Sequence, residues 1–226
     1  IANAKELFQS KLNQIFSHRG EGWEELFLKD ISNSFGRGKS KHRPRNWEGL
    51  YDGVYPFVQT GDIRNSDKYV TEFTQTYNEI GLSQSKLWNK GTICITIAAN
   101  IAETAILNFD ACFPDSIIGL EVNSKKANTD FVYYLLQYYK TELQGLSKGF
   151  AQQNINLGTF ENKKFIFPKS LEIQQKIVNQ LDQLQEQTNL LVTKYKQKLV
   201  NLEELKKSIL EKAFKGELST TVIEKV

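Results

Sequence analysis

The sequence predicts an α+β protein in which a globular body of mixed strands and short helices is followed by one long, coiled-coil-forming α-helix. Residues 171–214 contain no Pro and no Gly and carry apolar side chains at steps of three and four. Residues 21–168 instead contain recurring glycines and short apolar runs between polar turns. Apolar residues make up 40% of the 226 residues, which suffices for a core and excludes a mainly disordered chain.

Short runs rich in β-branched and aromatic residues predict the strands of the body. The predicted strands span residues 55–59, 92–98, 105–108, 117–122 and 164–167. A helix is predicted over residues 129–146, with Asn128 or Thr129 as its N-cap. The apolar stripe of this helix, which we expect to face the core, consists of Phe131, Leu135, Tyr138, Tyr139, Leu143 and Leu146.

The long helix is predicted to begin at Leu171 and to end near Phe214. Ser170 is a suitable N-cap, Pro168 prevents helix upstream, and Gly216 is a suitable stop signal. At 1.5 Å per residue the helix would be about 65 Å long, too long to lie on a body of this size. Its apolar stripe therefore needs a partner helix, and we expect a homodimer through antiparallel pairing. The stripe consists of Ile177, Leu181, Leu184, Leu191, Tyr195, Leu199, Leu202, Leu205 and Ile209.

The two ends of the sequence share a short pattern, LFQSKLNQIF at residues 7–16 and LKKSILEKAF at residues 205–214. The identical positions, at a constant offset of 198, are Leu7/Leu205, Ser10/Ser208, Leu12/Leu210 and Phe16/Phe214. Chance similarity between two amphipathic helix ends is one explanation. The other is a parent protein that repeats body plus helix. On that interpretation the chain divides into the end of a preceding helix (1–16), a body (17–168), a long helix (171–215) and a tail (216–226).

Motifs for catalysis or metal binding are missing from the sequence. With only two histidines in the sequence, His18 and His42, we expect no structural zinc site. Cys94 and Cys112 lie in apolar contexts without a CxxC pair and are expected to be reduced core residues. Pro114-Asp115 followed by Glu121 resembles a nuclease metal site, but Asn123 stands where that site needs lysine. The sequence also lacks an Asn/Asp-Pro-Pro-aromatic loop, a GxGxxG loop and a Walker lysine. We expect no catalysis, metal or cofactor in this chain, with an enzyme whose site is unrecognised as the alternative.

Membrane and export signals are also missing. No apolar run approaches the ~18 residues that span a bilayer, and the amino terminus lacks a basic-then-apolar signal pattern. We therefore expect an intracellular, cytoplasmic protein without a membrane partner.

Cations are concentrated in one segment, residues 36–47, whereas the net charge of the whole chain is only +3. The segment contains no acid, and its five cations are Arg37, Lys39, Lys41, Arg43 and Arg45. Ammonium and guanidinium groups bind phosphates, and a guanidinium fork can also bind guanine edges. We predict that this basic segment contacts double-stranded DNA, with a solvated loop as the alternative.

Two further segments are rich in amide and hydroxyl groups. Their candidate residues are Gln59, Thr60 and Asp62 in the first segment and Gln152, Gln153 and Asn154 in the second. Asn and Gln make bidentate contacts with adenine, and the same side chains also suit capping turns. We predict these six residues as additional base or backbone contacts.

Taken together, the segments resemble the specificity (S) subunit of type I restriction–modification systems. The matching pieces are YPFVQTGDI (55–63), ITIAANIAETAIL (95–107) followed by Asp110-Ala111-Cys112, KGFAQQNINLGTFENKKFIFP (148–168), LEIQQKIV (171–178) and LKKSILEKAFKGEL (205–218). Their order carries the resemblance, which extends over nearly the whole chain. The chain departs from the family at residues 98–100, where Ala-Ala-Asn replaces a glycine-rich turn. It also departs at residues 167–174, where FPKSLEIQ replaces a PLPEEQ pattern.

The resemblance implies that residues 17–168 form a target recognition domain that reads one half of a bipartite DNA site. It implies that the helix at 171–215 pairs with a second long helix, which sets the spacing between the two halves. A subunit of this family does not methylate or cut DNA. It docks onto methyltransferase (M) and restriction (R) subunits, and S-adenosylmethionine, ATP and Mg²⁺ are then expected only in those partners. The alternative is a coiled-coil assembly scaffold without direct DNA readout.

Overall fold

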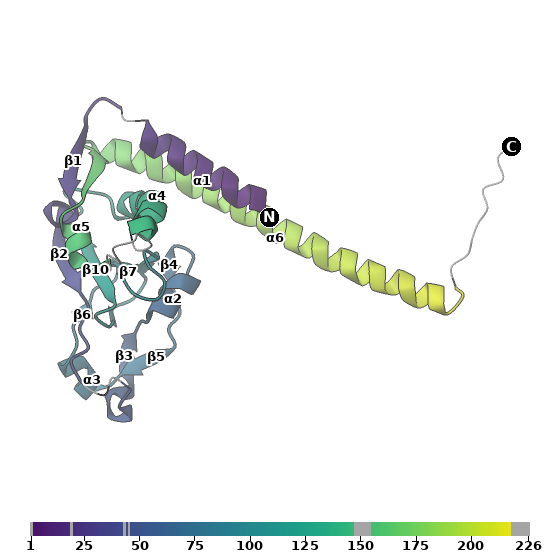
Figure 1. The fold of residues 1–226 in the computed structure, drawn as a ribbon, viewed down its shortest axis with the longest axis horizontal. Coiled ribbons are helices and arrows are strands. Elements are labelled where there is room, and N and C mark those ends of the chain that lie inside the picture. Colours follow the sequence, from purple (N-terminus) through teal and green to yellow (C-terminus); the bar gives the residue numbers. More distant parts are fainter. Residues whose placement is uncertain (1, 19, 43, 45, 147–154, 218–226) are drawn as a thin grey trace. The chain divides into compact units, whose positions relative to one another are not determined.

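A computed structural model describes residues 2–18, 20–42, 44, 46–146 and 155–217. The fold is α+β, as predicted, with mixed strands and short helices followed by a long helix (Figure 1). The chain forms two units. The body unit comprises Leu12–Gln180, and the helix unit comprises Ile1–Lys11 and Leu181–Val226.

Within the described residues, the strands of the body unit form three β-sheets. The strand orders are β2-β10-β7-β8-β4 in the first sheet, β5-β3-β9-β6 in the second and β1-β11 in the third. Neighbouring strands pair antiparallel except for β3 with β9 and β4 with β8. The strands are β1 (Trp23–Phe27), β2 (Ser32–Arg37), β3 (Tyr51–Phe57), β4 (Tyr69–Val70), β5 (Gln75–Tyr77), β6 (Leu87–Trp88), β7 (Ile93–Thr96), β8 (Thr104–Leu107), β9 (Ala111–Cys112), β10 (Ile117–Val122) and β11 (Lys164–Pro168).

The described residues form three short and three longer α-helices. The α-helices are α1 (Ala2–Ser17), α2 (Thr60–Asn65), α3 (Glu79–Ser83), α4 (Thr129–Leu146), α5 (Leu157–Glu161) and α6 (Leu171–Phe214). Two 3₁₀ turns, η1 (Leu28–Ile31) and η2 (Glu48–Leu50), precede β2 and β3. No described helix is both long and apolar enough to cross a membrane.

All five predicted strands occur in the structure, and β10 has the predicted bounds. The predicted end of the strand at 55–59 was wrong, because β3 ends at Phe57. Gln59 instead begins the turn into α2, where its backbone N–H donates to Asp62 Oδ2 at 2.8 Å. This side-chain acceptor takes the place of a strand partner and turns the chain into a helix.

The core of the body unit is apolar and closely packed. Trp88 and Phe113 stack at 5.1 Å within a cluster of buried aliphatic side chains. Cys94 and Cys112 are buried free thiols, as predicted, and burial raises the pKa of both. A raised thiol pKa leaves little reactive thiolate near neutral pH, so both cysteines act as small core residues.

Helix α4 has the predicted bounds and is capped by Asn128, whose Oδ1 accepts the Phe131 N–H at 3.0 Å. Of its predicted stripe, Tyr138 is half-buried and the side chain of Leu146 lies outside the described residues. The fully buried members are Phe131, Leu135, Tyr139 and Leu143. Phe16 of α1 packs on this helix, with its ring stacked 5.4 Å from that of Tyr138.

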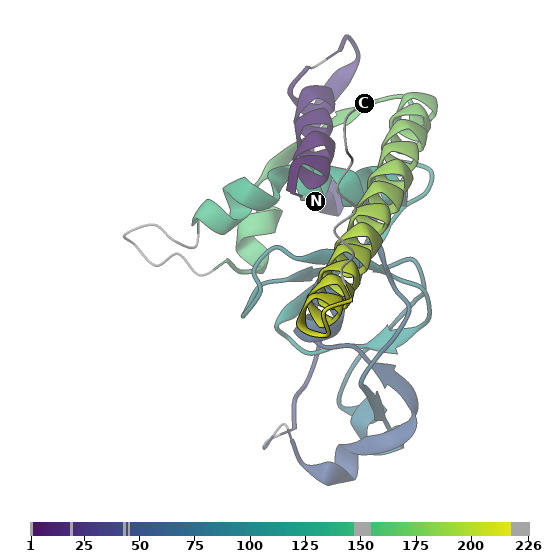
Figure 2. The same ribbon diagram turned by 90° about the vertical axis from the view of Figure 1, so that its right-hand side faces the viewer.

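Helix α6 also begins and ends where the sequence predicts. Ser170 Oγ accepts the Ile173 N–H at 3.4 Å, and Gly216 adopts the left-handed conformation at φ 73° that ends a helix. Figures 1 and 2 show α1 beside the first part of α6 and running in the opposite direction. Each unit contains part of this helix pair.

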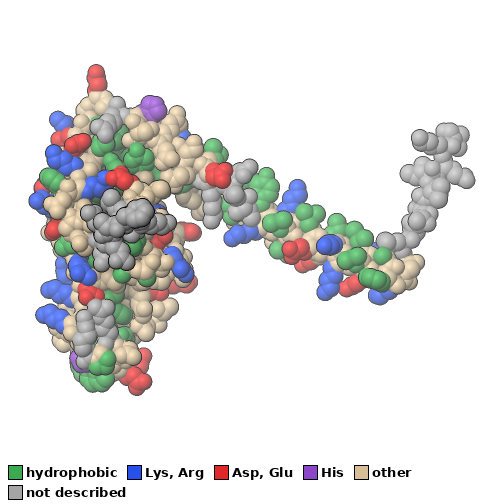
Figure 3. Space-filling view, viewed as in Figure 1, with side chains coloured by type: hydrophobic (Ala, Val, Ile, Leu, Met, Phe, Trp, Pro, Cys, Tyr) green, Lys and Arg blue, Asp and Glu red, His purple; other side chains and the backbone are tan. Residues whose placement is uncertain are grey.

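The apolar stripe of α6 is only partly exposed. Ile177 and Leu181, which the sequence predicts as dimerisation residues, are buried, because α1 lies beside this part of α6. Leu184 is half-buried. The other six side chains are 41–55% exposed, and Figure 3 shows hydrophobic surface along this length of the helix. They are Leu191, Tyr195, Leu199, Leu202, Leu205 and Ile209.

Candidate nucleic-acid interface

The basic segment begins on a strand. Arg37 is the last residue of β2 and pairs with Ile118 of β10, while its Nε donates to the Asp115 carbonyl at 2.6 Å. Arg37, Lys39 and Lys41 are exposed. The predicted residues Arg43 and Arg45 lie outside the described residues.

Close backbone packing fixes the start of this segment. The Gly38 N–H donates to the Ile117 carbonyl at 2.8 Å. A Cβ at Gly38 would lie 2.3 Å from the Phe113 carbonyl oxygen and 2.4 Å from that of Pro114. Only glycine allows the backbone to approach so closely. The exposed Arg37 and Lys39 are therefore held beside residues 113–117.

The turn after α3 holds the next part of the segment. Gln84 Oε1 accepts the backbone N–H groups of Lys41 at 2.6 Å and His42 at 2.9 Å. Ser85 Oγ donates to the Lys39 carbonyl at 2.8 Å. These three bonds fix the backbone from residue 39 to residue 42 while leaving the Lys39 and Lys41 side chains in solvent.

A further cation, Lys86, which sequence reasoning missed, reaches the same region from the residue before β6. Lys86 Nζ lies 3.3 Å from the ring centroid of Trp88 and donates to Ser34 Oγ at 2.7 Å. Burial lowers the pKa of Lys86, with Lys39 as a smaller cause in the same direction and Glu121 opposing it. Because Lys86 stands alone between a turn and a two-residue strand, nothing in the sequence marks it as a cation near the basic segment.

A hollow of about 360 Å³, here called the polar hollow, opens next to the basic segment. Its lining comes from four parts of the chain that are distant in sequence. The lining residues are Ser40, Asn46, Tyr51, Phe57, Gln59, Thr60, Gln75, Pro114 and Ser116. The structure therefore brings the predicted Gln59 and Thr60 together with Ser40 of the basic segment. It also adds Asn46 and Gln75, which were not predicted.

Two glutamines of the polar hollow are hydrogen-bonded to each other. Antiparallel pairing of β3 with β5 places Phe57 opposite Gln75, and the chain reaches Gln59 two residues later. Gln59 Nε2 donates to Gln75 Oε1 at 2.5 Å. This pair depends on strand register across a connection of 16 residues, which a single sequence does not reveal.

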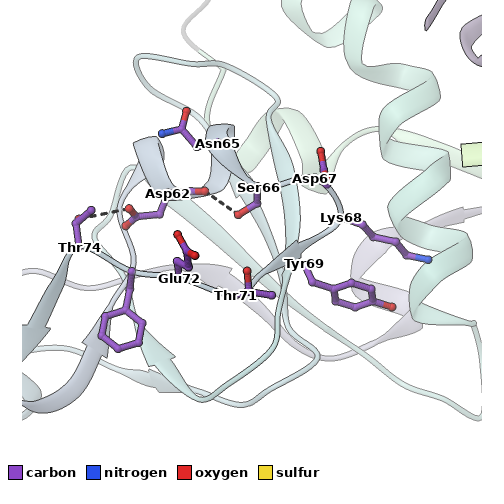
Figure 4. A pocket seen from close by; sticks show the side chains of 10 residues that line it. Asp62, Asn65, Ser66, Asp67, Lys68, Tyr69, Thr71, Glu72 and Thr74 are labelled. Carbon is purple, nitrogen blue, oxygen red and sulfur yellow. Dashed lines mark hydrogen bonds between the residues drawn. The ribbon is translucent and has the colours of Figure 1, made fainter. Parts of the chain in front are cut away.

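Asp62 has a structural role in the turn. Its carboxylate accepts the Gln59 N–H at 2.8 Å and the Thr74 hydroxyl at 3.3 Å. It also lines a second, acidic hollow of about 580 Å³ that contains Asp67 and Glu72 (Figure 4). The three carboxylates of this hollow are negatively charged and would repel a phosphate. Asp62 therefore fixes the turn that carries Gln59.

The other predicted features are the second amide-rich segment and the nuclease-like arrangement. Gln152, Gln153 and Asn154 lie outside the described residues. In the nuclease-like arrangement, Glu121 Oε1 accepts from Asn89 Nδ2 at 3.0 Å. Across the described ranges, no three or more His, Cys, Asp or Glu side chains are grouped to hold a metal ion.

Known solved structures share this fold. A chain from the structural study of complex assembly and conformational transition of the type I R-M system matches with a TM-score of 0.77 at 24% identity, over 96% of this chain and 53% of that one. The HsdS subunit from Thermoanaerobacter tengcongensis matches with a TM-score of 0.69 at 23% identity, over 96% and 52%. The S subunit from M. genitalium matches with a TM-score of 0.60 at 18% identity, over 93% and 54%.

Sequence comparison extends the likeness. The chain is 28% identical over 203 residues to the type I restriction enzyme MjaX specificity subunit of Methanocaldococcus jannaschii, covering 79% of this chain and 48% of that protein. The chain thus spans about half the length of its relatives. The family model for the type I restriction modification DNA specificity domain matches residues 20–201. With the polar hollow and the basic segment in the matched region, the chain belongs to the family of type I restriction modification DNA specificity domains.

Proposed function

We propose that this chain is a non-catalytic DNA-binding subunit that reads one half of a bipartite target site and directs methyltransferase and restriction subunits to it. The observation that carries the proposal is the position of the basic segment beside the polar hollow in a chain of this family. Cations on an ordered backbone bind phosphates and orient the protein, and amide and hydroxyl groups beside them can contact base edges.

The phosphate-binding part of this surface consists of the exposed Arg37, Lys39 and Lys41. We include Arg43 and Arg45 because they continue the same run of cations in the sequence. The candidate base contacts are Gln59 and Thr60 in the polar hollow, together with Gln152, Gln153 and Asn154 from the sequence. Asp62 acts through the Gln59 turn.

Membership of this family supports methyltransferase and restriction subunits as the proposed partners. A subunit that only reads DNA needs a methyltransferase for S-adenosylmethionine chemistry and a restriction subunit for ATP- and Mg²⁺-dependent cleavage. We place those cofactors in the partners. We also propose that two copies of this chain associate through α6, because six side chains of its stripe are about half exposed.

The test is binding to a duplex of random sequence at increasing salt concentration. Each phosphate contact releases counterions, so log K should fall linearly with log salt. Replacing Arg37 and Lys39 with Ala should weaken binding and reduce the magnitude of the slope by about one for each phosphate that is no longer neutralised. The Lys206→Ala, Lys207→Ala chain removes the same charge from exposed positions of α6 and is the matched control.

The outcomes separate the proposal from its alternative. A coiled-coil scaffold without DNA readout would show neither duplex binding nor a salt slope. If log K falls with log salt at the same slope in the Arg37/Lys39 variant and in the control, these two cations of the basic segment do not bind phosphates. Selection from a randomised duplex library with the methyltransferase subunit present would then identify the half-site of the wild-type chain.

A further inference from the structure

A hydrogen bond joins the side chains of Gln59 and Gln75 in the polar hollow. Gln75 is exposed on β5, an edge strand of its sheet, and Gln59 lies at the beginning of α2. The bond uses one amide hydrogen of Gln59 and one lone pair of Gln75. The two amide atoms outside this bond are Gln59 Oε1, an acceptor, and Gln75 Nε2, a donor.

This character does not depend on the direction of the bond. If Gln75 donated to Gln59 instead, Gln75 Oε1 and Gln59 Nε2 would be the groups left available. Either arrangement leaves one amide oxygen and one amide nitrogen outside the bond. A neutral amide pair is also less costly to desolvate against a base edge than a charged side chain.

Among the bases, this pattern matches adenine in the major groove. Adenine presents its N6 amino group as a donor next to N7 as an acceptor. Guanine presents two acceptors, cytosine a donor without the adjacent acceptor, and thymine an acceptor beside a methyl group. One glutamine amide can contact N6 and N7 together. Two amides held against each other offer the same pair of groups with less freedom to rotate.

The surroundings of the pair restrict its motion and place it next to phosphate-binding groups. Asp62 accepts from both the Gln59 N–H and the Thr74 hydroxyl, so it connects the two segments that carry the glutamines. Ser40, Pro114 and Ser116 line the same hollow. Ser40 lies within the basic segment, and Asp115, between the other two, accepts from Arg37.

We propose that the Gln59–Gln75 pair is a specificity-determining element that recognises one adenine of the target half-site through its N6 and N7 atoms. This inference rests on the proposed function, because it assumes that the polar hollow faces duplex DNA. It adds the identity of one base and the two side chains that select it.

The first experiment is selection from a randomised duplex library by the full chain with the methyltransferase subunit. The wild-type chain should select a half-site with an adenine at one fixed position. Gln59→Ala and Gln75→Ala should each reduce the adenine preference at that position by about ten- to a hundredfold and leave the other positions unchanged. Gln197→Ala, an exposed amide on α6, is the matched control. Thermal melting should confirm that all variants remain folded.

The second experiment removes a hydrogen-bond acceptor, N7, from the selected adenine, whereas the first removes amide groups from the protein. Replacing the selected adenine with 7-deazaadenine deletes N7 and retains N6. If the pair contacts this base, the modified duplex should bind the wild-type chain about tenfold more weakly than the adenine duplex. In the observed arrangement Gln75→Ala already lacks the donor to N7, so the same replacement should cause little further loss of affinity in that variant. Because the first half of this test uses the wild-type chain, it does not depend on the folding of any variant.

The results distinguish the two levels of the proposal. A wild-type chain that selects no sequence contradicts the proposed function itself. A wild-type chain that selects a half-site which both glutamine variants also select, with equal strength, leaves that function standing and overturns the role of the pair. The role of the pair would also be overturned if the loss from 7-deazaadenine simply added to the loss from Gln59→Ala and to the loss from Gln75→Ala.

Discussion

The side-chain Oε1 of Gln84 accepts a hydrogen bond from the backbone N–H of Lys41 at 2.6 Å, and the same oxygen accepts the N–H of His42. One glutamine in the turn after α3 thus satisfies two consecutive donors of the basic segment. The side chains of Ser40 and Gln84 also lie beside the buried hydroxyl of Tyr77, whose pKa is raised by burial. The segment that we assign to phosphate binding is therefore ordered in part by a residue outside it, Gln84.

Gln84→Ala should loosen this segment. Leaving two backbone N–H groups without their acceptor should reduce the free energy of unfolding by about 1–3 kcal/mol. Duplex affinity should fall several-fold because the cations lose their fixed positions. Urea unfolding and duplex titration measure the two effects. Ser83→Ala, at the end of the same helix, is the control, and equal behaviour of the two variants would show that Gln84 does not order the segment.

Two glycines that flank Arg37 allow a matched comparison. A Cβ at Gly38 would lie within 2.4 Å of two carbonyl oxygens, whereas a Cβ at Gly36 would meet nothing within 4 Å. Gly38→Ala should therefore displace the backbone and destabilise the chain by about 2–4 kcal/mol, with Gly36→Ala within about 1 kcal/mol of wild type. Denaturant unfolding decides between them. Similar losses in both variants would contradict the close approach at residue 38.

The turn after β7 contains a strained alanine. Ala99 has φ 61°, in the left-handed region that disfavours a Cβ. Ala99→Gly should raise the free energy of unfolding by about 0.5–1 kcal/mol, because relief of strain exceeds the entropy cost of glycine. Ala98→Gly, one residue earlier without a positive φ, should lower stability slightly. A thermal melt that ranks the two variants in the opposite order would contradict this account.

The sequence predicts the bounds of α4 and the start of α6 to the residue, and the end of α6 to within one residue, because these ends depend on local chemistry. Asn128 and Ser170 supply N-caps, and Gly216 supplies the left-handed stop. Of the β1–β11 pair, only β11 was predicted, as the strand at residues 164–167. Trp23–Phe27 contains two glutamates, and it becomes a strand by pairing with residues more than 130 positions away. Such a pairing leaves no local pattern.

The candidate site, like the fold, has parts that the local sequence predicts and parts that depend on contacts between distant segments. A run of cations is visible in the sequence, so the basic segment could be predicted. Gln75 could not, because its role arises from strand register opposite Phe57 and from the bond to Gln59. Gln84 and Lys86 were missed for the same reason, since each contacts a segment more than 40 residues away. The groups that order a site are spread more widely along the chain than the groups that bind.

The last prediction concerns association through α6. Leu12 and Phe16 of α1 are 0% and 2% exposed, whereas their counterparts in the repeated pattern, Leu210 and Phe214, are 47% and 89% exposed. The end of α6 therefore lacks the cover that the equivalent end of α1 has. Burying each leucine-sized side chain contributes about 1.5–3 kcal/mol, so an uncovered stripe favours association. We expect a two-fold dimer with antiparallel α6 helices.

Sedimentation equilibrium at micromolar concentration measures this association against the monomer mass of 26.0 kDa. Leu199→Lys with Leu202→Lys should yield monomers, because two charges would be buried in the interface without partners. Both residues are about half exposed, so the body unit should keep its fold and its melting temperature. Gln197→Lys with Asn201→Lys adds the same charge at exposed polar positions and should remain dimeric. A stable wild-type monomer would rule out the dimer, and a dimer that survives the leucine substitutions would place its interface away from this stripe.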